Sequence, residues 1–190
     1  MEISPEVKQV IDEMKKSMEK SIEVLKDHLA TVKTGRANPG LLESIKVEYY
    51  GVLTPINQVA SITVPEPRML VIEPWDKNII KEIEKAITNS DLGVNPINEG
   101  NLIRIVLPPL TEERRKELTK LVKKYGEEIK IALRNERRDA LDQLKKMKKE
   151  GTISEDLYNH LEKEVLDILH SFEKKVDELV ENKEKEILTV

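Results

Sequence analysis

An abrupt change in the spacing of apolar residues divides this chain of 190 residues into three parts. The first and last parts carry apolar side chains at alternating steps of three and four, the spacing of amphipathic helices. The middle part, about 35–108, holds seven of the nine prolines and five of the seven glycines. Long helices do not tolerate that density of Pro and Gly. We therefore expect a non-helical region inserted between long helices.

Three long helices are predicted, over residues 4–34, 111–150 and 154–187, because each begins with a Ser or Thr that can cap a helix. Gly126 is expected to interrupt the second helix at a cost of about 1 kcal/mol relative to Ala. Gly151 is the expected stop before the third helix. Three amphipathic helices need a common core, so we predict an elongated antiparallel three-helix bundle.

The middle region contains short apolar runs that are typical of β-strands. A short helix, capped by Asp76, is predicted between the third and fourth runs. The four runs cover residues 45–49, 59–64, 69–72 and 102–107. This mixture predicts a small α/β domain, arranged as a β/α/β sandwich.

The predicted fold class is therefore α+β, with two domains. Residues 1–34 and 108–190 are assigned to the bundle (domain I), and residues 35–107 to the inserted domain (domain II). Because the chain crosses between them twice, we expect an L-shaped molecule with limited movement about the two crossings.

Composition narrows the possible functions. Charged residues make up 36% of the chain and hydrophobic residues 38%, which suits long solvated helices around a real core. The net charge of −4 means that any nucleic-acid contact needs a local basic patch. Cysteine is absent, which excludes disulfides and cysteine nucleophiles. No signal peptide or membrane helix is evident, so we expect a cytoplasmic protein without a membrane partner.

No catalytic constellation is visible in the sequence. The only histidines, His28, His160 and His170, fall within predicted helices, and no two of them share a face at the i,i+4 spacing of metal ligands. Neither a phosphate-binding loop nor a dinucleotide fingerprint is present. We therefore expect no catalytic residue, no metal and no cofactor, and hence a protein that is not an enzyme.

The second long helix sorts its charges by sign. On a helical projection most of its basic residues share an arc about 100° wide, between the apolar face and most of the acids. This basic stripe consists of Lys116, Lys120, Lys123, Lys130, Arg134, Arg137, Arg138, Lys145 and Lys148, with Arg115 just outside it. The ordinary interpretation of a charged helix is a solvated face with mixed i,i+4 pairs.

The central arginines favour a more specific interpretation of the basic stripe. Arg134, Arg137 and Arg138 stand close together with no acid at the matching spacing on their side of the helix. Arginine suits bidentate recognition of phosphate. Aromatic residues are only 3% of the chain, which disfavours recognition of single strands by base stacking. The stripe is therefore expected to bind folded RNA through its shape and phosphates.

Two other classes of protein compete with this interpretation. A coiled-coil scaffold could bind another protein through the charged helix, although it would not explain the inserted domain or the separation of charge. An enzyme could use the inserted domain, although no pocket chemistry is visible. Binding to folded RNA at varied salt concentration would distinguish the scaffold from the RNA-binding protein.

Several ordered segments resemble the bacterial ribosome recycling factor family. They include the segment KTGRANP and the central motif RNERRDA, and together the matches cover essentially the whole chain. The matching segments are residues 33–39, 47–55, 86–96, 107–116 and 134–140.

The resemblance implies an L-shaped protein with roughly the outline of a tRNA. The family enters the space between the subunits of the post-termination ribosome and binds large-subunit ribosomal RNA through the bundle. With the GTPase elongation factor G it splits the subunits and releases the mRNA, and GTP hydrolysis belongs to the elongation factor. We expect the same partners here, and a monomer.

The resemblance also carries over candidate site residues. The RNA-contacting arginines of the family correspond to Arg115, Arg134 and Arg137, with Arg138 and Lys130 as neighbours, and Lys123 of the basic stripe completes the set. The inserted domain would be the arm against which the elongation factor pushes. Its hinge would lie at the crossings, at Thr34, Gly35, Arg36 and Pro108.

Overall fold

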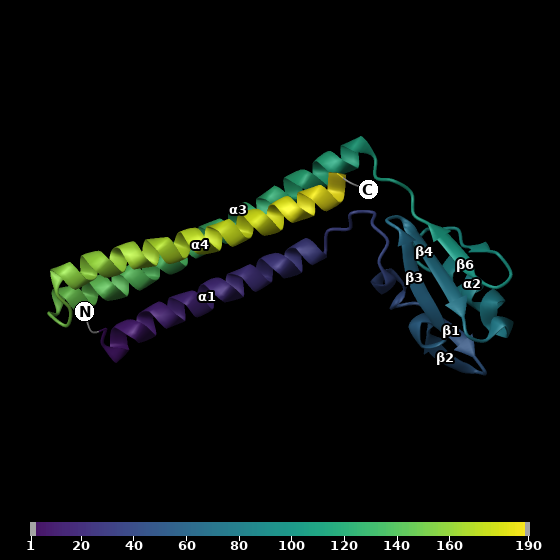
Figure 1. Ribbon diagram of the computed structural model, residues 1–190, viewed down its shortest axis with the longest axis horizontal. Helices are drawn as coiled ribbons and strands as arrows, with labels where there is room; N and C mark the ends of the chain where they lie inside the picture. The colour runs from purple at the N-terminus through teal and green to yellow at the C-terminus, as the bar shows by residue number, and fades with distance from the viewer. Residues whose placement is uncertain (1–2, 189–190) are drawn as a thin grey trace. The chain divides into compact units, whose positions relative to one another are not determined.

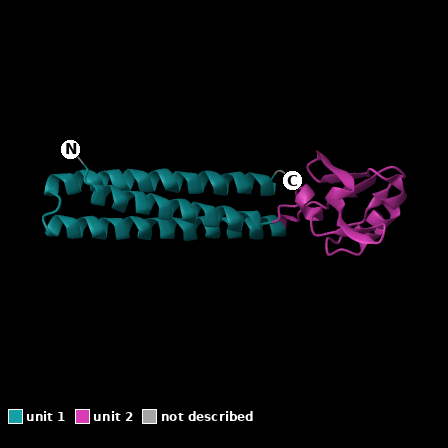
Figure 2. Ribbon diagram, turned by 90° about the horizontal axis from the view of Figure 1, so that it is seen from below, with its two compact units in different colours: residues 1–32, 113–188 teal, residues 33–112, 189–190 magenta. Residues whose placement is uncertain are grey.

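The computed structural model describes residues 3–188 and divides them into two compact units (Figure 1). Residues 3–32 and 113–188 form one unit, and residues 33–112 form the other (Figure 2). The sequence prediction placed the boundaries at 34/35 and 107/108. The structure assigns the short segments 33–34 and 108–112 to the inserted unit.

The first unit is the predicted three-helix bundle. It consists of α1 (Pro5–Ala30), α3 (Glu112–Lys149) and α4 (Glu155–Leu188), which run side by side (Figures 1 and 2). The apolar stripe of each helix is buried against the other two. From α3 the buried residues include Leu118, Val122, Ile129, Leu133, Ala140 and Leu144. The predicted core face of this helix is confirmed.

Local capping explains where α1 begins and ends. At its start, the Ser4 hydroxyl accepts a hydrogen bond from the Val7 amide at 3.4 Å, as expected of an N-cap. The predicted end near Gly35 is wrong, because α1 stops at Ala30. There the Thr31 hydroxyl donates to the His28 carbonyl at 2.6 Å and so satisfies a carbonyl of the last turn.

The turn between α3 and α4 has the geometry that glycine permits. Gly151 has a φ of +78°, and its amide bonds to the Lys148 carbonyl at 3.1 Å. The Thr152 amide bonds to the Met147 carbonyl at 2.9 Å, which satisfies a second carbonyl of the last turn. The predicted stop at Gly151 is therefore confirmed.

Gly126 does not interrupt α3, contrary to the prediction. The helix continues through it, and Gly126 is buried. A Cβ atom added at this position would lie 2.7 Å from Cγ2 of Val180 and 3.6 Å from Cγ1 of Val176. The missing side chain therefore lets α3 and α4 approach closely. Packing between the helices decides the residue here, rather than intrinsic helix propensity.

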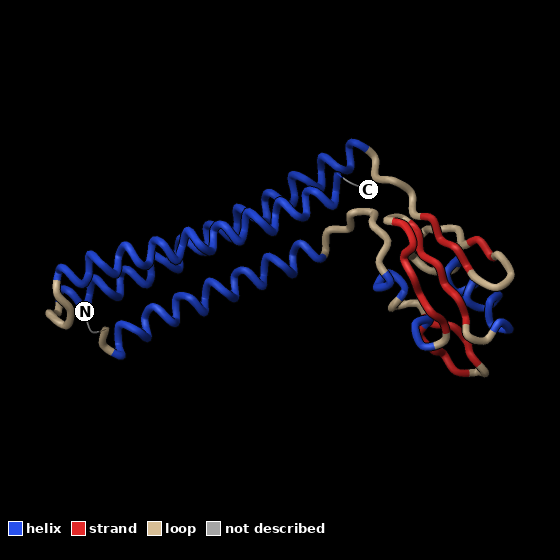
Figure 3. The backbone as a smooth tube through the Cα atoms, in the orientation of Figure 1, coloured by secondary structure: helices blue, strands red, loops and turns tan. Residues whose placement is uncertain are grey.

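The inserted unit contains two antiparallel sheets (Figure 3). Strands β1 (Lys46–Tyr49) and β2 (Val52–Pro55) form a hairpin. The larger sheet has the order β3-β4-β6-β5. Its strands are β3 (Ala60–Glu66), β4 (Met69–Pro74), β5 (Ile97–Asn98) and β6 (Ile103–Val106). Helix α2 (Ile80–Thr88) lies between β4 and β5. It follows a short 3-10 turn, and the side chain of Asp76 caps the start of that turn.

The core of the inserted unit joins its helix to both sheets. Val47 of β1, Ile72 of β4, Ile83 of α2 and Ile105 of β6 are all fully buried in one cluster. The four strands predicted from the sequence are present as β1, β3, β4 and β6. The prediction missed β2 and β5. Both lack the alternation of buried and exposed residues that identifies a strand, and β5 is only two residues long.

Candidate nucleic-acid interface

The basic stripe lies along α3, and the structure shows how accessible each candidate residue is. Lys123, Arg134 and Arg138 are exposed, whereas Arg115, Lys130 and Arg137 are half-buried. The half-buried residues keep their aliphatic stems against the bundle, as long basic side chains commonly do. The stripe is therefore a solvated surface and not part of the core.

Helix α4 supplies acidic partners for this stripe. Nζ of Lys130 lies 2.6 Å from Oδ1 of Asp177, and Nη2 of Arg134 lies 3.4 Å from Oε2 of Glu173. Glu127 of α3 lies 3.6 Å from Nη1 of Arg134. The expectation that acids are absent beside the arginines is thus corrected. Because the main partners come from a different helix, the spacing within α3 could not reveal them.

Residues of α3 and α4 together line an open groove of about 700 Å³. It brings together three of the six candidate RNA-binding residues on one wall. Its α3 side is lined by Arg134, Arg137, Arg138, Leu141, Asp142 and Lys145, and its α4 side by Glu162, Leu169, His170 and Glu173. A groove with several guanidinium groups along one edge can hold phosphate groups in fixed positions.

Arg137 has a distinct environment within this groove. Its Nε atom is buried and, among the described residues, has no hydrogen-bond partner. Leu141, which the projection puts inside the basic arc, is buried and fills the space behind the arginines. Because Arg137 lines the groove, its guanidinium group can bind an anion that enters there.

Tyr158 lies on α4 between the groove residue Glu162 and the turn to α3. Lys148 lies over the Tyr158 ring at 4.4 Å from its centroid, a cation–π geometry. Burial raises the pKa of the Tyr158 phenol and the neighbouring Glu162 raises it further, whereas Arg137 lowers it. The charges of Arg137 and Glu162 therefore both act on the Tyr158 phenol.

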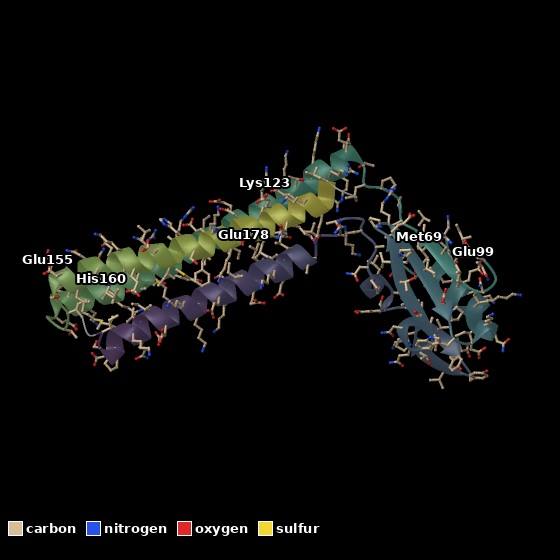
Figure 4. The ribbon with its side chains drawn as sticks, viewed as in Figure 1. Met69, Glu99, Lys123, Glu155, His160 and Glu178 are labelled. Carbon is tan, nitrogen blue, oxygen red and sulfur yellow. The ribbon has the colours of Figure 1, made fainter. Side chains whose placement is uncertain are left out.

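Arg115 and Lys123 do not belong to the groove. At a rise of about 1.5 Å per residue they lie about 28 Å and about 17 Å from Arg134 along the helix. Figure 4 labels Lys123 on α3, well away from the α3–α4 turn near which His160 lies. The six candidate residues therefore form one extended line rather than a single cluster. A line of that length matches a phosphate backbone better than one small ligand.

The sequence analysis missed the acidic and imidazole groups that border the stripe. Glu162, His170, Glu173 and Asp177 all lie on α4 and face α3. Their spacing on α4 gives a weak signal by itself. The register between the two antiparallel helices decides which cation of α3 each of these residues faces.

The candidate hinge residues all lie in the inserted unit, close to its boundaries. Thr34 is buried, and Arg36 and Pro108 are exposed. Gly35 has a φ of +77°, and a Cβ atom added to it would lie 3.2 Å from Cγ of Leu110. This conformation strongly favours glycine. Gly35 thus has a backbone role, although it is not the stop of α1.

The histidines show no arrangement for metal binding. His28 contacts the ring of Tyr125, with 4.8 Å between centroids, and His160 and His170 are exposed. Within residues 3–188, no group of three or more His, Asp or Glu side chains is placed to hold a metal ion. Over the same residues, every helix is too polar or too short to cross a membrane.

The fold defines a class of helical-bundle proteins that carry a sheet domain between their first two long helices. A family model for ribosome recycling factor matches residues 25–188. The ribosome-recycling factor of Geobacillus thermodenitrificans is 57% identical over 96% of this chain and 99% of its own length. That of Bacillus subtilis is 54% identical over 96% and 99%. The chain belongs to the ribosome recycling factor family, and the resemblance seen in its sequence is confirmed.

Solved structures agree with this assignment. A solution structure of ribosome recycling factor matches with a TM-score of 0.69 at 40% identity, over 99% of this chain and 100% of that one. A second match has a TM-score of 0.61 at 52% identity, over 96% and 98% of the two chains. It comes from models for the T. thermophilus ribosome recycling factor and the E. coli elongation factor G bound to the E. coli post-termination complex.

Proposed function

We propose that this protein recycles ribosomes after termination. It binds post-termination ribosomes between the subunits and, with elongation factor G and GTP, splits them and releases the mRNA. This proposal rests on similarity to ribosome-recycling factors over nearly the whole chain, with 57% identity over 96% of it, together with the arginine-lined face of α3. One solved relative is bound to a post-termination complex together with elongation factor G.

The bundle is assigned to large-subunit ribosomal RNA. The proposed contacts to phosphate run along α3 and comprise Arg115, Lys123, Lys130, Arg134, Arg137 and Arg138. If about five of them neutralise phosphates, the logarithm of the binding constant falls with the logarithm of the salt concentration with a slope of about −4. This slope distinguishes phosphate binding from a protein-binding scaffold, which would respond weakly to salt.

The inserted unit is assigned to the second step, in which elongation factor G acts. Thr34, Gly35, Arg36 and Pro108 are proposed as the hinge that lets this unit move. Gly35→Pro tests this role, because proline fixes φ near −65° and Gly35 has a φ of +77°. The variant is expected to bind subunits normally but to split ribosomes slowly. Normal splitting by a folded Gly35→Pro protein would refute the hinge.

This function needs no catalytic group in the chain itself. We infer that it is not an enzyme, and that it acts in the cytoplasm as a monomer, with GTP hydrolysis carried out by elongation factor G. Sedimentation of the purified protein tests the oligomeric state. A GTPase assay of the protein alone should show no hydrolysis above that of buffer.

The decisive experiment is a subunit-splitting assay. Purified post-termination ribosomes are mixed with the protein, elongation factor G and GTP, and light scattering reports the separation of subunits. Scattering should fall only when all three components are present. Omission of each component in turn supplies the controls. Intact ribosomes in the complete mixture would refute the proposed function.

A further inference from the structure

Helix α4 runs antiparallel to α3 and places a row of polar groups beside the basic stripe. Two ion pairs between the helices define the register: Lys130 with Asp177 at 2.6 Å, and Arg134 with Glu173 at 3.4 Å. The members of these pairs are four residues apart on each helix and run in opposite directions, as antiparallel packing requires. Both basic residues of these pairs belong to the proposed RNA-binding set.

The same register continues along the groove. Three residues beyond Arg134, Arg137 comes level with His170, and further on Lys145 comes level with Glu162. All four of these side chains line the groove. Arg137 therefore stands level with an imidazole, whereas Lys130 and Arg134 each hold a carboxylate. Among residues 3–188, Lys130 and Arg134 are thus paired with carboxylates of α4, whereas Arg137 is among the stripe cations for which no such pair is seen.

The paired acids occupy the positions that RNA phosphates would need. The side chain of Glu173 is only 20% exposed, so it is held in place, whereas that of Arg134 is 49% exposed. A phosphate that binds Arg134 must either displace this carboxylate or approach it closely. Like charges brought together in an interface lower affinity. Because each pair has one solvent-exposed partner, Arg134 or Asp177, solvent weakens both ion pairs and a phosphate can displace the carboxylate.

We propose that Glu173 and Asp177 compete with RNA phosphates for Arg134 and Lys130 and so limit the affinity of this protein for ribosomal RNA. Arg137, which forms no ion pair with a carboxylate of α4 within residues 3–188, binds phosphate without this competition. A factor that must leave the separated subunit after each round benefits from such a limit, because affinity is set mainly by the rate of dissociation. This inference rests on the proposed function, in which the stripe binds RNA.

The test compares variants that each remove one negative charge from α4. Glu173→Gln and Asp177→Asn remove the two competing carboxylates. Glu178→Gln is the matched control, because Glu178 is an exposed acid of α4 that lines the groove shared with α1 instead (Figure 4). All three variants have the same net charge. Their dissociation constants for purified large ribosomal subunits are measured over a range of salt concentrations.

We expect Glu173→Gln and Asp177→Asn each to bind about twofold to fivefold more tightly, in line with the strength of exposed ion pairs. The double variant should bind about tenfold more tightly and dissociate more slowly. Its log–log salt slope should steepen by about one for each freed cation. Glu178→Gln should bind like the unchanged protein. Glu173→Asp, which keeps the charge, should also bind like it.

Three results would overturn the inference. Weaker binding by Glu173→Gln would show that the acids hold the cations in a productive position. Equal tightening by Glu178→Gln would show that only net charge matters. Unchanged binding in all the variants would show no competition.

The proposed function fails in a different way. In that case the unchanged protein would not bind subunits, or would bind without dependence on salt. Thermal unfolding of each variant shows whether it is folded. If Glu173→Gln proves unstable, Asp177→Asn still decides the question, because Asp177 is 64% exposed and its replacement leaves the core intact.

Discussion

The bundle and the inserted unit differ in what they expose to solvent. The bundle presents long charged faces, and its α3 and α4 carry opposite excesses of charge that meet along the groove. The smaller inserted unit exposes most of the large apolar side chains that are accessible in this protein, among them Tyr50, Val52, Leu53 and Trp75. We therefore expect charge to dominate recognition by the bundle. From this difference we also expect that substitutions can alter the charged surface of the bundle and the apolar core of the inserted unit separately.

The largest expected effect lies in the core of the inserted unit. Ile72 is fully buried in β4, where it pairs with Ile62 of β3 and Ile103 of β6. Ile72→Ala should destabilise this unit by about 2–5 kcal/mol, because it removes apolar contacts and leaves a cavity. Chemical denaturation monitored by circular dichroism measures the change. Ile97→Ala, at an exposed position, is the control and should have little effect.

If the bundle binds RNA independently of the inserted unit, binding to large ribosomal subunits should survive Ile72→Ala at temperatures where the bundle is folded. Loss of binding in parallel with the loss of structure in the inserted unit would show that the two units do not act independently. The experiment therefore tests the comparison and not only the packing of one side chain.

The next effect concerns the surface of the bundle. Arg137→Ala should weaken binding to large ribosomal subunits by about tenfold to a hundredfold, the range for loss of hydrogen bonds to a charged group. The stability of the bundle should change little, because Arg137 lies on its polar face. Lys124→Ala, at an exposed position outside the basic stripe, is the control. Normal binding by a folded Arg137→Ala protein would remove the central residue of the proposed interface.

A smaller effect is expected at the contact between α3 and α4. Gly126→Ala would gain about 1 kcal/mol from helix propensity if Gly126 were solvated. Here the added Cβ would lie 2.7 Å from Val180, and overpacking of this kind costs about 1–3 kcal/mol. We expect a net loss of stability in thermal unfolding. A more stable variant would mean that the two helices can separate slightly without penalty.

The smallest effect involves pH. The Ser21 hydroxyl donates to Oε1 of Glu136 at 2.6 Å, while Oε2 is buried and has no hydrogen-bond partner among the described residues. Burial raises the pKa of Glu136 above its ordinary value of 4.5, and this outweighs the opposing effect of Ser21. The folded state therefore holds the proton more tightly than the unfolded state. Glu136 stabilises the fold most below pH 4.5, and this contribution is lost as the pH rises.

Glu136→Gln checks this sign. The stability of the variant relative to the unchanged protein should increase as the pH is raised from below 4.5 toward neutrality, and then level off. Chemical denaturation across this range measures the difference. Glu13→Gln, at an exposed position of α1 near the same contact, is the charge-matched control. A difference that shrinks with rising pH would reverse the assignment.

Much of the fold was predictable because its signals are local. Ser4 and Gly151 act through hydrogen bonds to residues within one turn, and the apolar stripe of α3 repeats with the period of the helix itself. Such interactions depend only on neighbours in the chain, so the sequence alone predicts them. The strands β2 and β5 escaped prediction because pairing with the neighbouring strands β1 and β6, rather than their own pattern, makes them strands.

The candidate site divides in the same way. The sequence by itself determined which side of α3 carries the arginines, since helical geometry alone sorts residues around an axis. Only the tertiary structure decided that Glu173 and Asp177 hold two of the cations, that Leu141 lies buried among them, and that Gly126 is needed for packing. The physical reason is that these facts depend on the register between helices, which is set by the packing of residues far apart in the chain.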